Sequence, residues 1–169
     1  MRVKNRQTVH LRPMTEEDVP VIHQLEREAF QKAWTVQQLK NELAHPFNTA
    51  VVAETDARIL GYFFSSDVAG ELSLNRIAVA EDCRKGGIGK RLVARFLADG
   101  QRDGAEEAFL EVNERNTAAK ALYQAFGFVV VGKRHQYYAE EMADALIMHC
   151  RLSKESECHR EERHVHFSH

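Results

Sequence analysis

The residues best suited to chemistry lie in a glycine-rich stretch, R-K-G-G-I-G-K, at positions 84–90. It follows the apolar run Ile77, Ala78 and Val79, which predicts the end of a buried strand. It leads into apolar residues at helical spacing, Ile88, Leu92, Val93, Phe96 and Leu97. Backbone N–H groups at such a turn lack partners and lie at the positive end of the helix dipole. We therefore predict a phosphate or pyrophosphate site. Its residues are Arg84, Lys85, Gly86, Gly87, Ile88, Gly89 and Lys90.

Two common phosphate-binding motifs do not fit this stretch. A P-loop requires G-x-x-x-x-G-K-[ST], but Arg84 occupies the first glycine position and Arg91 follows the lysine. A dinucleotide-binding fingerprint requires a third glycine three residues after Gly89, where the chain has Leu92. The pattern that remains is R-x-x-G-x-G, formed by Arg84, Gly87 and Gly89.

A second group of chemically useful residues lies at positions 109–128, F-L-E-V-N-E-R-N-T-A-A-K-A-L-Y-Q-A-F-G-F. Strand alternation places Glu111 on the face opposite Leu110 and Val112, and a carboxylate in a mostly apolar strand needs a partner or becomes a candidate for proton transfer. Asn116 and Tyr123 are seven residues apart in the helix that follows, so they project to nearly the same side. Taken singly, the three residues also fit a solvent-facing carboxylate, a helix cap and a core tyrosine.

Together these segments resemble the GNAT family of N-acetyltransferases. R-x-x-G-x-G is similar to the family's acetyl-coenzyme A signature, [QR]-x-x-G-x-[GA], and L-E-V-x-x-x-N-x-x-A-x-x-L-Y-x-x-x-G-F at 110–128 resembles its second half. K-R-H-Q-Y-Y at 133–138 is similar to the family's R-x-x-Y-Y hairpin, and D-A-L-I-M at 144–148 to its D-A-x-x-M strand. The resemblance extends from His10 to Leu152, and its nearest form is the bacterial ribosomal-protein-alanine N-acetyltransferases.

The resemblance implies transfer of an acetyl group from acetyl-coenzyme A by direct attack in a ternary complex, with coenzyme A as product. It implies that the glycine-rich turn holds the pyrophosphate and that the strand ending at Val79 pairs with the pantetheine arm, with a backbone N–H facing the thioester oxygen. Glu111 is implied as the base, acting directly or through water, and Tyr123 as the acid for the leaving thiolate. Asn116 is implied to hold the pantetheine arm.

On the acceptor side the resemblance implies contacts from Glu71, Trp34, Tyr137, Tyr138 and Asp144. Glu71 is expected beside a peptide groove that the two tyrosines line, although adjacent strand residues point to opposite faces, so one of them contacts the substrate unless the hairpin is irregular. Asp144 either fixes that hairpin or faces the substrate, and Trp34 is either a contact or a core residue.

The expected acceptor is the N-terminal α-amino group of a protein or peptide, such as a ribosomal protein. An α-amino group has a pKa of about 8 and needs a weaker base than a lysine side chain, whose pKa is about 10.4. A lysine or a small amine as acceptor is the alternative within the enzyme class. A non-catalytic acyl-coenzyme A-binding domain is the alternative outside it.

Departures from the family pattern concern two loops. The family's F-P-x-P-W-S before the second helix reads F-Q-K-A-W-T at 30–35, without either proline. The usual proline after I-A-V-x is Glu81, and Cys83 replaces an aromatic residue before the arginine. The missing prolines predict a less rigid loop on the substrate side, which affects the choice of peptide more than the chemistry.

Length and composition fit one domain. The chain has 169 residues, of which 44% are hydrophobic and 28% charged, and a formal net charge of −2, so neither nucleic acid nor a membrane is an expected partner. Three widely spaced cysteines are typical of reduced cytoplasmic thiols. We expect one domain over 1–152, a polar disordered tail over 153–169, and a monomer or weak dimer. The tail holds Cys158, His159, His164, His166 and His169, but no scaffold that would fix a metal, so no metal site is predicted.

The expected fold is α/β, with a mixed, mostly antiparallel seven-stranded sheet flanked by about four helices in the order β-α-α-β-β-β-α-β-α-β-β. Strands are predicted at 9–12, 49–54, 59–67, 71–79, 107–113, 128–132 and 145–152. Helices are predicted at 15–30, from Thr35 to before Pro46, after the glycine-rich turn and at 116–126. Thr15 with Asp18, and Thr35 with Gln38, have the spacing of capping boxes.

Overall fold

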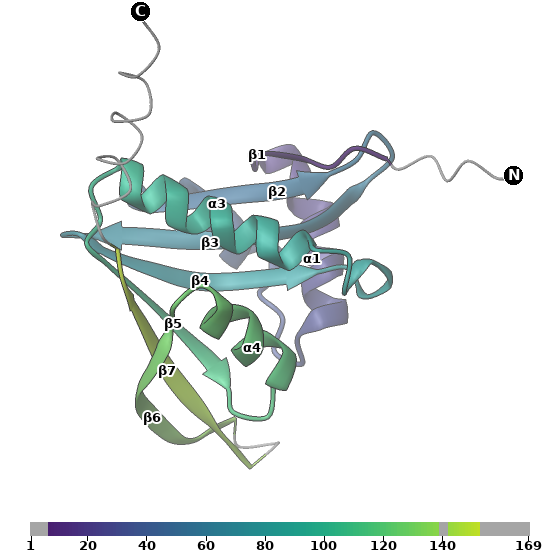
Figure 1. Ribbon diagram of the computed structural model, residues 1–169. Helices are drawn as coiled ribbons and strands as arrows, with labels where there is room; N and C mark the ends of the chain where they lie inside the picture. The colour runs from purple at the N-terminus through teal and green to yellow at the C-terminus, as the bar shows by residue number, and fades with distance from the viewer. Residues whose placement is uncertain (1–6, 139–141, 153–169) are drawn as a thin grey trace, which may run out of the picture.

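A computed structural model describes residues 7–138 and 142–152, with the side chains of 136–138 excepted, so the predictions made for the tail lie outside the described residues. Over these ranges seven strands and four α-helices follow one another in the expected order (Figure 1). The strands are β1 His10–Pro13, β2 Asn48–Glu54, β3 Ile59–Val68, β4 Glu71–Val79, β5 Glu107–Asn113, β6 Val129–Tyr138 and β7 Ala143–Arg151. The helices are α1 Val19–Ala29, α2 Val36–Ala44, α3 Ile88–Arg102 and α4 Thr117–Ala125, and short 3-10 turns lie at η1 Glu16–Asp18 and η2 Glu81–Cys83. Within the described ranges no helix is long and apolar enough to cross a membrane.

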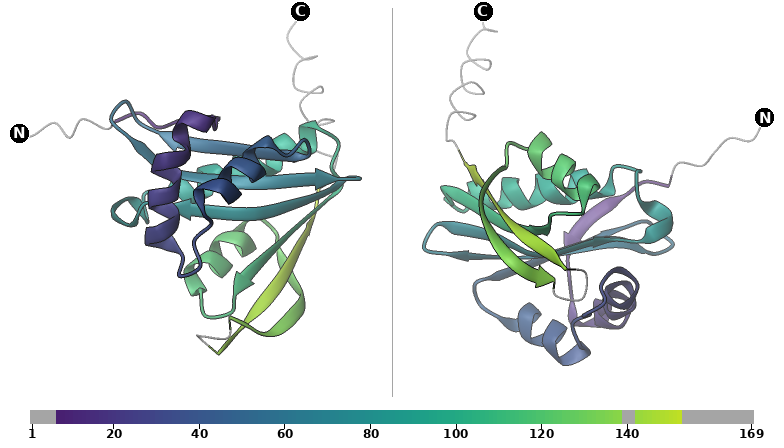
Figure 2. Two further views of the ribbon diagram at one scale, coloured as in Figure 1. Left: turned by 180° about the vertical axis from the view of Figure 1, so that it is seen from behind. Right: turned by 90° about the horizontal axis from the view of Figure 1, so that it is seen from below.

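The strands form one sheet in the order β1-β2-β3-β4-β5-β7-β6. Every neighbouring pair is antiparallel except β4 and β5, which run parallel from the pair Glu71–Glu107 to the pair Leu74–Leu110. Helices α3 and α4 cover one face of the sheet, and α1 and α2 cover the other face over β2 to β4 (Figure 2). On the α1 side, the helices in the described ranges therefore do not cover β5, β7 and β6.

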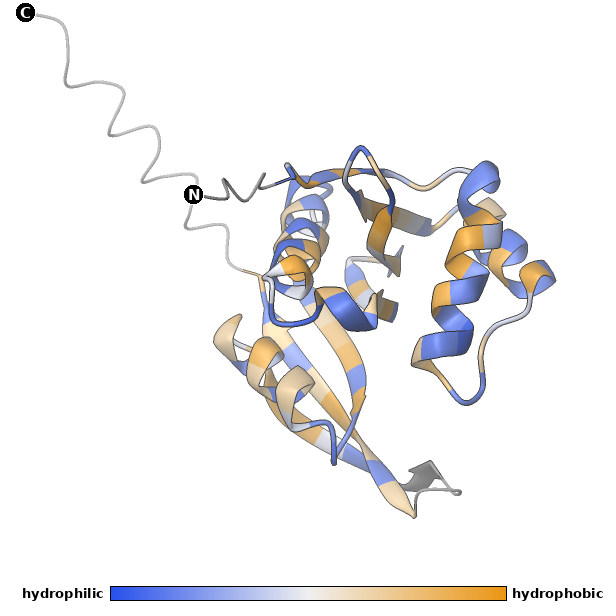
Figure 3. Cartoon of the chain, turned by 90° about the vertical axis from the view of Figure 1, so that its right-hand side faces the viewer, coloured by the Kyte–Doolittle hydropathy of each residue, from blue (hydrophilic) through white to orange (hydrophobic). Residues whose placement is uncertain are grey.

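Two apolar clusters fix these layers. The cluster on the α3 side includes the predicted helix stripe, with Leu92 and Val93 0% exposed and Phe96 1% exposed. The cluster on the α1 side includes Ile22 and Leu39, both 0% exposed. Figure 3 shows hydrophobic residues alternating with hydrophilic ones around the helices, as the periodicity predicts.

Local differences from the sequence predictions have identifiable causes. The first turn of the helix predicted at 15–30 is the 3-10 turn η1, where the Thr15 N–H donates to Asp18 at 2.7 Å. The capping box of α2 is confirmed, because the Gln38 N–H donates to Thr35 Oγ1 at 3.1 Å and the Thr35 N–H donates to Gln38 Oε1 at 2.8 Å. Strand β6 continues past the predicted end at Gly132, since its pairing with β7 extends to Tyr138 across a shift in register.

A β-bulge in β4 shapes the centre of the sheet. Phe64 on β3 pairs with Arg76 and Ser65 pairs with Leu74, so Asn75 is an extra residue on β4. The pairing of β4 with β5 ends at Leu74, directly before this bulge. A bulge bends and twists its strand. Accordingly, the second half of β4 diverges from β5, and the two strands open like a V (Figure 1).

Candidate active site

The diverging half of β4 presents backbone groups toward the opening. The Ala80 N–H donates to Leu60 O on β3 at 2.7 Å, so the backbone groups of Ala80 and Ala78 point toward β3. Backbone direction alternates along a strand, and the N–H groups of Ile77 and Val79 therefore point the other way, toward the side that β5 has left. At the end of this edge, Arg84 Nε donates to Val79 O at 3.3 Å.

The glycine-rich turn follows directly. Gly87 is the N-cap of α3 at φ +85°, and Lys85 is also left-handed at φ +68°. The Arg84 N–H donates to Glu81 O at 3.4 Å, and the Arg91 N–H donates to Gly87 O at 3.1 Å. Among the described residues, the N–H groups of 85–90 between them donate to no backbone oxygen. The N–H groups between these two bonds lie at the N-terminus of a 15-residue helix, in an arrangement that suits a phosphate.

Turn η2, before the glycines, is tied to the β2–β3 connection. Arg58 Nη2 lies 2.6 Å from Asp82 Oδ2 and 2.9 Å from Cys83 Sγ. The hydrogen bond from Arg58 lowers the pKa of Asp82, and burial raises the pKa of the Cys83 thiol. This ion pair holds the turn at the place where the family pattern has a proline and the chain has Glu81.

Helix α4 packs against the first turn of α3. A Cβ atom on Gly89 would lie 3.3 Å from Leu122 Cδ2, so the glycine allows this close approach. The next residue, Tyr123, is 5% exposed, and its ring centroid lies 6.1 Å from that of Phe128. Asn116 caps α4, its Oδ1 accepting from the Ala119 N–H at 3.1 Å. Asn116 is therefore a helix cap and Tyr123 is a core residue, and helix α4, which carries Tyr123, lies beside the opening (Figure 1).

Glu111 projects to the face of the sheet opposite Tyr123. Its β5 neighbours Leu110 and Val112 are buried in the cluster beneath α3, which also contains Tyr123, whereas Glu111 faces the α1 side. The partner that a carboxylate requires in this strand is Arg134 on β6, whose Nη2 lies 3.0 Å from Glu111 Oε1. The Glu111 side chain is 31% exposed, so solvent can reach it.

Asp144 ties the β6–β7 hairpin to the end of β5. Its carboxylate lies 3.4 Å from His135 Nδ1 and 3.7 Å from Lys133 Nζ, both on β6. Its backbone N–H donates to Glu114 Oε1 at 3.2 Å, and its backbone O accepts from the Glu114 N–H at 2.9 Å. These contacts fit the hairpin-fixing alternative. The side chains of 137 and 138, predicted to line the groove, lie outside the described residues.

The structure does not bring Glu71 to the opening. It is the first residue of β4, pairs with Glu107, and lies where the two strands are still joined. It lies eight positions before Val79, which at about 3.3 Å per residue places it roughly 26 Å away along the strand. The predicted position of Glu71 beside the acceptor groove therefore conflicts with its place in the sheet.

Trp34 packs in the cluster on the α1 side, with its ring centroid 5.5 Å from that of Phe64. It belongs to a buried charge network that the sequence analysis missed. Glu26 is 0% exposed and accepts from Arg76, from the Trp34 N–H and from the Tyr62 hydroxyl at 2.6 Å. Burial, together with the charge of Glu26, raises the pKa of Tyr62. Two signals pointed to the pair: Glu26 follows Ile22 by four residues on the buried stripe of α1, and Arg76 interrupts an apolar strand.

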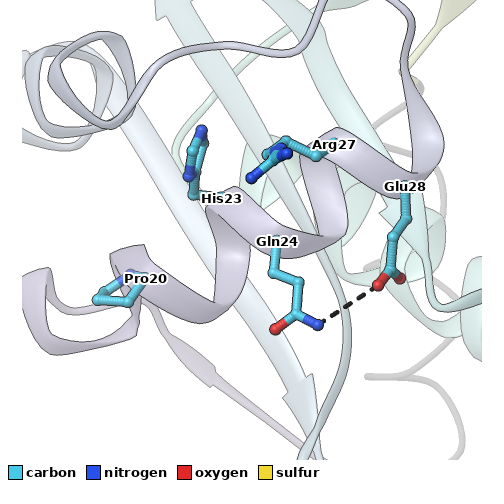
Figure 4. Close-up of a pocket in the computed structure, with 5 residues that line it drawn as sticks. All are labelled: Pro20, His23, Gln24, Arg27 and Glu28. Carbon is cyan, nitrogen blue, oxygen red and sulfur yellow. Dashed lines mark hydrogen bonds between the residues drawn. The ribbon is translucent and has the colours of Figure 1, made fainter.

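A hollow of about 600 Å³ lies along α1 and is separate from this site (Figure 4). Pro20, His23, Gln24, Arg27 and Glu28 line it, all from one helix. Gln24 Nε2 donates to Glu28 Oε1 at 3.4 Å across its rim. The hollow is therefore a feature of one helix surface and contains none of the predicted site residues.

Comparisons with known proteins agree with this geometry. The sequence profile of the Acetyltransferase (GNAT) family matches residues 19–128. The N-alpha-acetyltransferase RimI of Mycobacterium tuberculosis is 35% identical over 141 residues, 80% of this chain and 87% of that protein. A [Ribosomal protein bS18]-alanine N-acetyltransferase of Salmonella typhimurium is 31% identical over 134 residues, 78% of this chain and 89% of that protein. The crystal structure of the ribosomal-protein-S18-alanine N-acetyltransferase from Escherichia coli superposes with a TM-score of 0.81 at 24% identity, over 86% of this chain and 95% of that one. The chain therefore belongs to the GNAT family and is an acetyltransferase.

Proposed function

We propose that this acetyltransferase moves an acetyl group from acetyl-coenzyme A to the N-terminal α-amino group of a protein. The observation that carries the proposal is the opening between β4 and β5. It has a backbone edge that pairs with no strand in the described part of the chain and a glycine-rich turn at one end, and Glu111 and Tyr123 lie on opposite faces of the sheet. The relatives named for alanine N-acetylation support the choice of acceptor.

The residues around the turn fit acetyl-coenzyme A, which supplies the acetyl thioester when bound. The N–H groups from Lys85 to Lys90 would hold the pyrophosphate, since Gly87 has no atom within 4 Å of a potential Cβ and leaves space for close approach. The outward N–H groups of Ile77 and Val79 would pair with the pantetheine arm and the thioester oxygen. Ala78 lies between these two residues, and its backbone pairing with β3 holds this edge of β4 in place. The side-chain amide of Asn116 would donate a hydrogen bond to the pantetheine arm.

The positions of Glu111 and Tyr123 suit direct transfer in a ternary complex. Glu111 takes a proton from the amine, directly or through water, on the α1 side of the sheet. Tyr123 gives its hydroxyl proton to the sulfur that leaves on the α3 side. The amine nitrogen forms a bond to the acyl carbon while the carbon–sulfur bond breaks, so the products are an N-acetyl group and coenzyme A.

The acceptor side carries paired charges. Glu111, Glu114 and Asp144 place carboxylates at the carboxyl end of β5 and on the hairpin beside it, and each lies within ion-pair distance of a basic residue on β6. An acceptor ammonium group would approach Glu111 in competition with Arg134, so the preference for a peptide N-terminus rests on the named relatives rather than on a net negative charge. Tyr137, Tyr138 and Trp34 are kept as proposed acceptor contacts on the basis of the family resemblance. A lysine side chain or a small amine is the second candidate acceptor.

Mass spectrometry on one peptide tests the proposal. The peptide begins with alanine, is basic and contains a single internal lysine, and it is incubated with the protein and acetyl-coenzyme A. We expect the acetyl label on the α-amino group, with free thiol appearing at the same rate. A copy of the peptide with a blocked N-terminus is the control and should release no thiol. Label on lysine alone, or on small amines alone, would overturn the acceptor, and no thiol release with any amine would overturn the activity.

A further inference from the structure

We propose that Arg76, held by Glu26, is a positioning residue for the acceptor, because it fixes the loop between α1 and α2 as a wall of the acceptor site. This inference rests on the proposed function and concerns the same opening. The sequence predicts a less rigid loop here, since 30–35 lacks both prolines of the family pattern. The structure supplies a different means of holding the same loop.

The loop is held at three points by one buried ion pair. Arg76 Nε and Nη2 donate to the two carboxylate oxygens of Glu26 at 2.8 and 2.7 Å, a bidentate contact. Glu26 Oε2 also accepts from the backbone N–H of Trp34 at 3.0 Å, and Arg76 Nη2 donates to Lys32 O at 3.1 Å. The Arg76 guanidinium lies 3.6 Å from the ring centroid of Phe30 and 4.8 Å from that of Trp34.

The pair lies where the opening begins. Arg76 directly follows the bulged Asn75, and the pairing of β4 with β5 ends one residue earlier, at Leu74. Arg76 projects to the α1 side of the sheet, which is also the face that Glu111 projects to. The loop therefore borders the opening on the face from which the acceptor amine is proposed to approach.

Arginine is required here for its geometry as well as its charge. A planar guanidinium can stack between two rings while it donates to both oxygens of one carboxylate, and a lysine ammonium cannot do both. Arg76→Lys keeps the charge of the pair but releases the loop. Trp34 is the only tryptophan in the chain, so its fluorescence reports on the loop without any need for activity.

The test compares Arg76→Lys with Arg12→Lys. Arg12 forms a similar network with Asp18 and Glu54 on β1, three strands from β4 in the same sheet. For Arg76→Lys we expect at least a fivefold rise in the KM for the alanine peptide, an unchanged Kd for acetyl-coenzyme A by calorimetry, and stronger acrylamide quenching of Trp34. For Arg12→Lys we expect none of these changes. Should Arg76→Lys fail to fold, Phe30→Leu removes one stacking ring and should change the same readouts in the same direction.

Each outcome decides a separate question. Unchanged Trp34 quenching in a folded Arg76→Lys protein would show that the pair does not hold the loop. Increased quenching with an unchanged peptide KM would show that the loop is no part of the acceptor site, and either result overturns the proposal. Wild-type protein that releases no thiol with any peptide would overturn the proposed function instead, and quenching would still decide whether Arg76 holds the loop.

Discussion

At the scale of single residues, the proposed mechanism depends on Glu111 on β5 and Tyr123 on α4, which lie on opposite faces of the sheet. Glu111→Gln keeps the size of the side chain and one acceptor oxygen, but the amide cannot take a proton. Tyr123→Phe removes only the hydroxyl group that would protonate the leaving sulfur. We expect each change to lower kcat by roughly 10²–10⁴ while the Kd for acetyl-coenzyme A stays nearly constant. Steady-state kinetics and calorimetry on the same preparations measure both quantities.

Glu107→Gln is the matched control for this prediction. Glu107 lies on the same face of β5 as Glu111, four residues earlier, where β4 and β5 are still paired. Its substitution should leave kcat within about twofold, because it lies away from the opening. Near-normal turnover in Glu111→Gln or in Tyr123→Phe would remove that residue from its assigned role.

The sequence predicts the surroundings of a residue well when these are set by its neighbours in the chain, and poorly when they are set by a distant segment. Strand alternation is a local property, and it correctly separated Glu111 from the buried Leu110 and Val112. Arg76 and Glu26 lie 50 residues apart, and nothing within either segment specifies the other as its partner. A charged residue on an otherwise buried stripe is the sign that such a partner exists, but only the fold identifies it.

At the scale of elements, the turn before α3 depends on a left-handed glycine. Gly87 has φ +85° and no neighbouring atom that a Cβ would meet, so substitution costs about 1–2 kcal/mol of backbone strain without an internal clash. In Gly87→Val the added side chain would also occupy the space through which the pyrophosphate approaches the N–H groups. We expect calorimetry to show no acetyl-coenzyme A binding to a protein that remains folded.

Gly104 offers the control for this element. It has φ +90°, an equally open environment, and a position just past the opposite end of α3. Gly104→Val should therefore lower the thermal stability by a similar amount and leave the cofactor Kd unchanged. Equal affinity in Gly87→Val and the wild type would remove the turn from the cofactor site.

The ends of an element could be predicted where its apolar pattern and the turn residues that flank it lie within the same short stretch of sequence. The predicted limits of β4 and β5 match the structure to the residue, since each strand has an apolar face and clear flanking turns. The bulge at Asn75 and the extension of β6 past Gly132 were missed. Both features are set by pairing with another strand. In β6, an edge strand, the polar run K-R-H-Q also lacks the alternation of apolar and polar residues that would indicate a strand.

At the scale of the whole molecule, two parts of the sheet meet at one short junction. Strands β1 to β4 and strands β5 to β7 are joined by the parallel pairs from Glu71 to Leu74 alone among the described pairings. Beyond this junction the backbone edge of β4 and the N–H groups of the turn have no strand or helix partner among the residues that the structure describes. A ligand that pairs with both would act as an additional strand between the two parts.

Binding of acetyl-coenzyme A should therefore stabilise the molecule and protect particular amides. At a ligand concentration of 100 times Kd, the stabilisation is about 2.7 kcal/mol, which corresponds to a rise in Tm of roughly 5–10 °C for a domain of this size. Hydrogen exchange should slow at the N–H groups of Ile77 and Val79 and across 85–90, while the amides of β1 and β2 change only through the global increase in stability. Gly87→Val should lose both effects together. A rise in Tm with protection confined to α1, near the hollow of Figure 4, would place the ligand elsewhere and contradict the opening as the cofactor site.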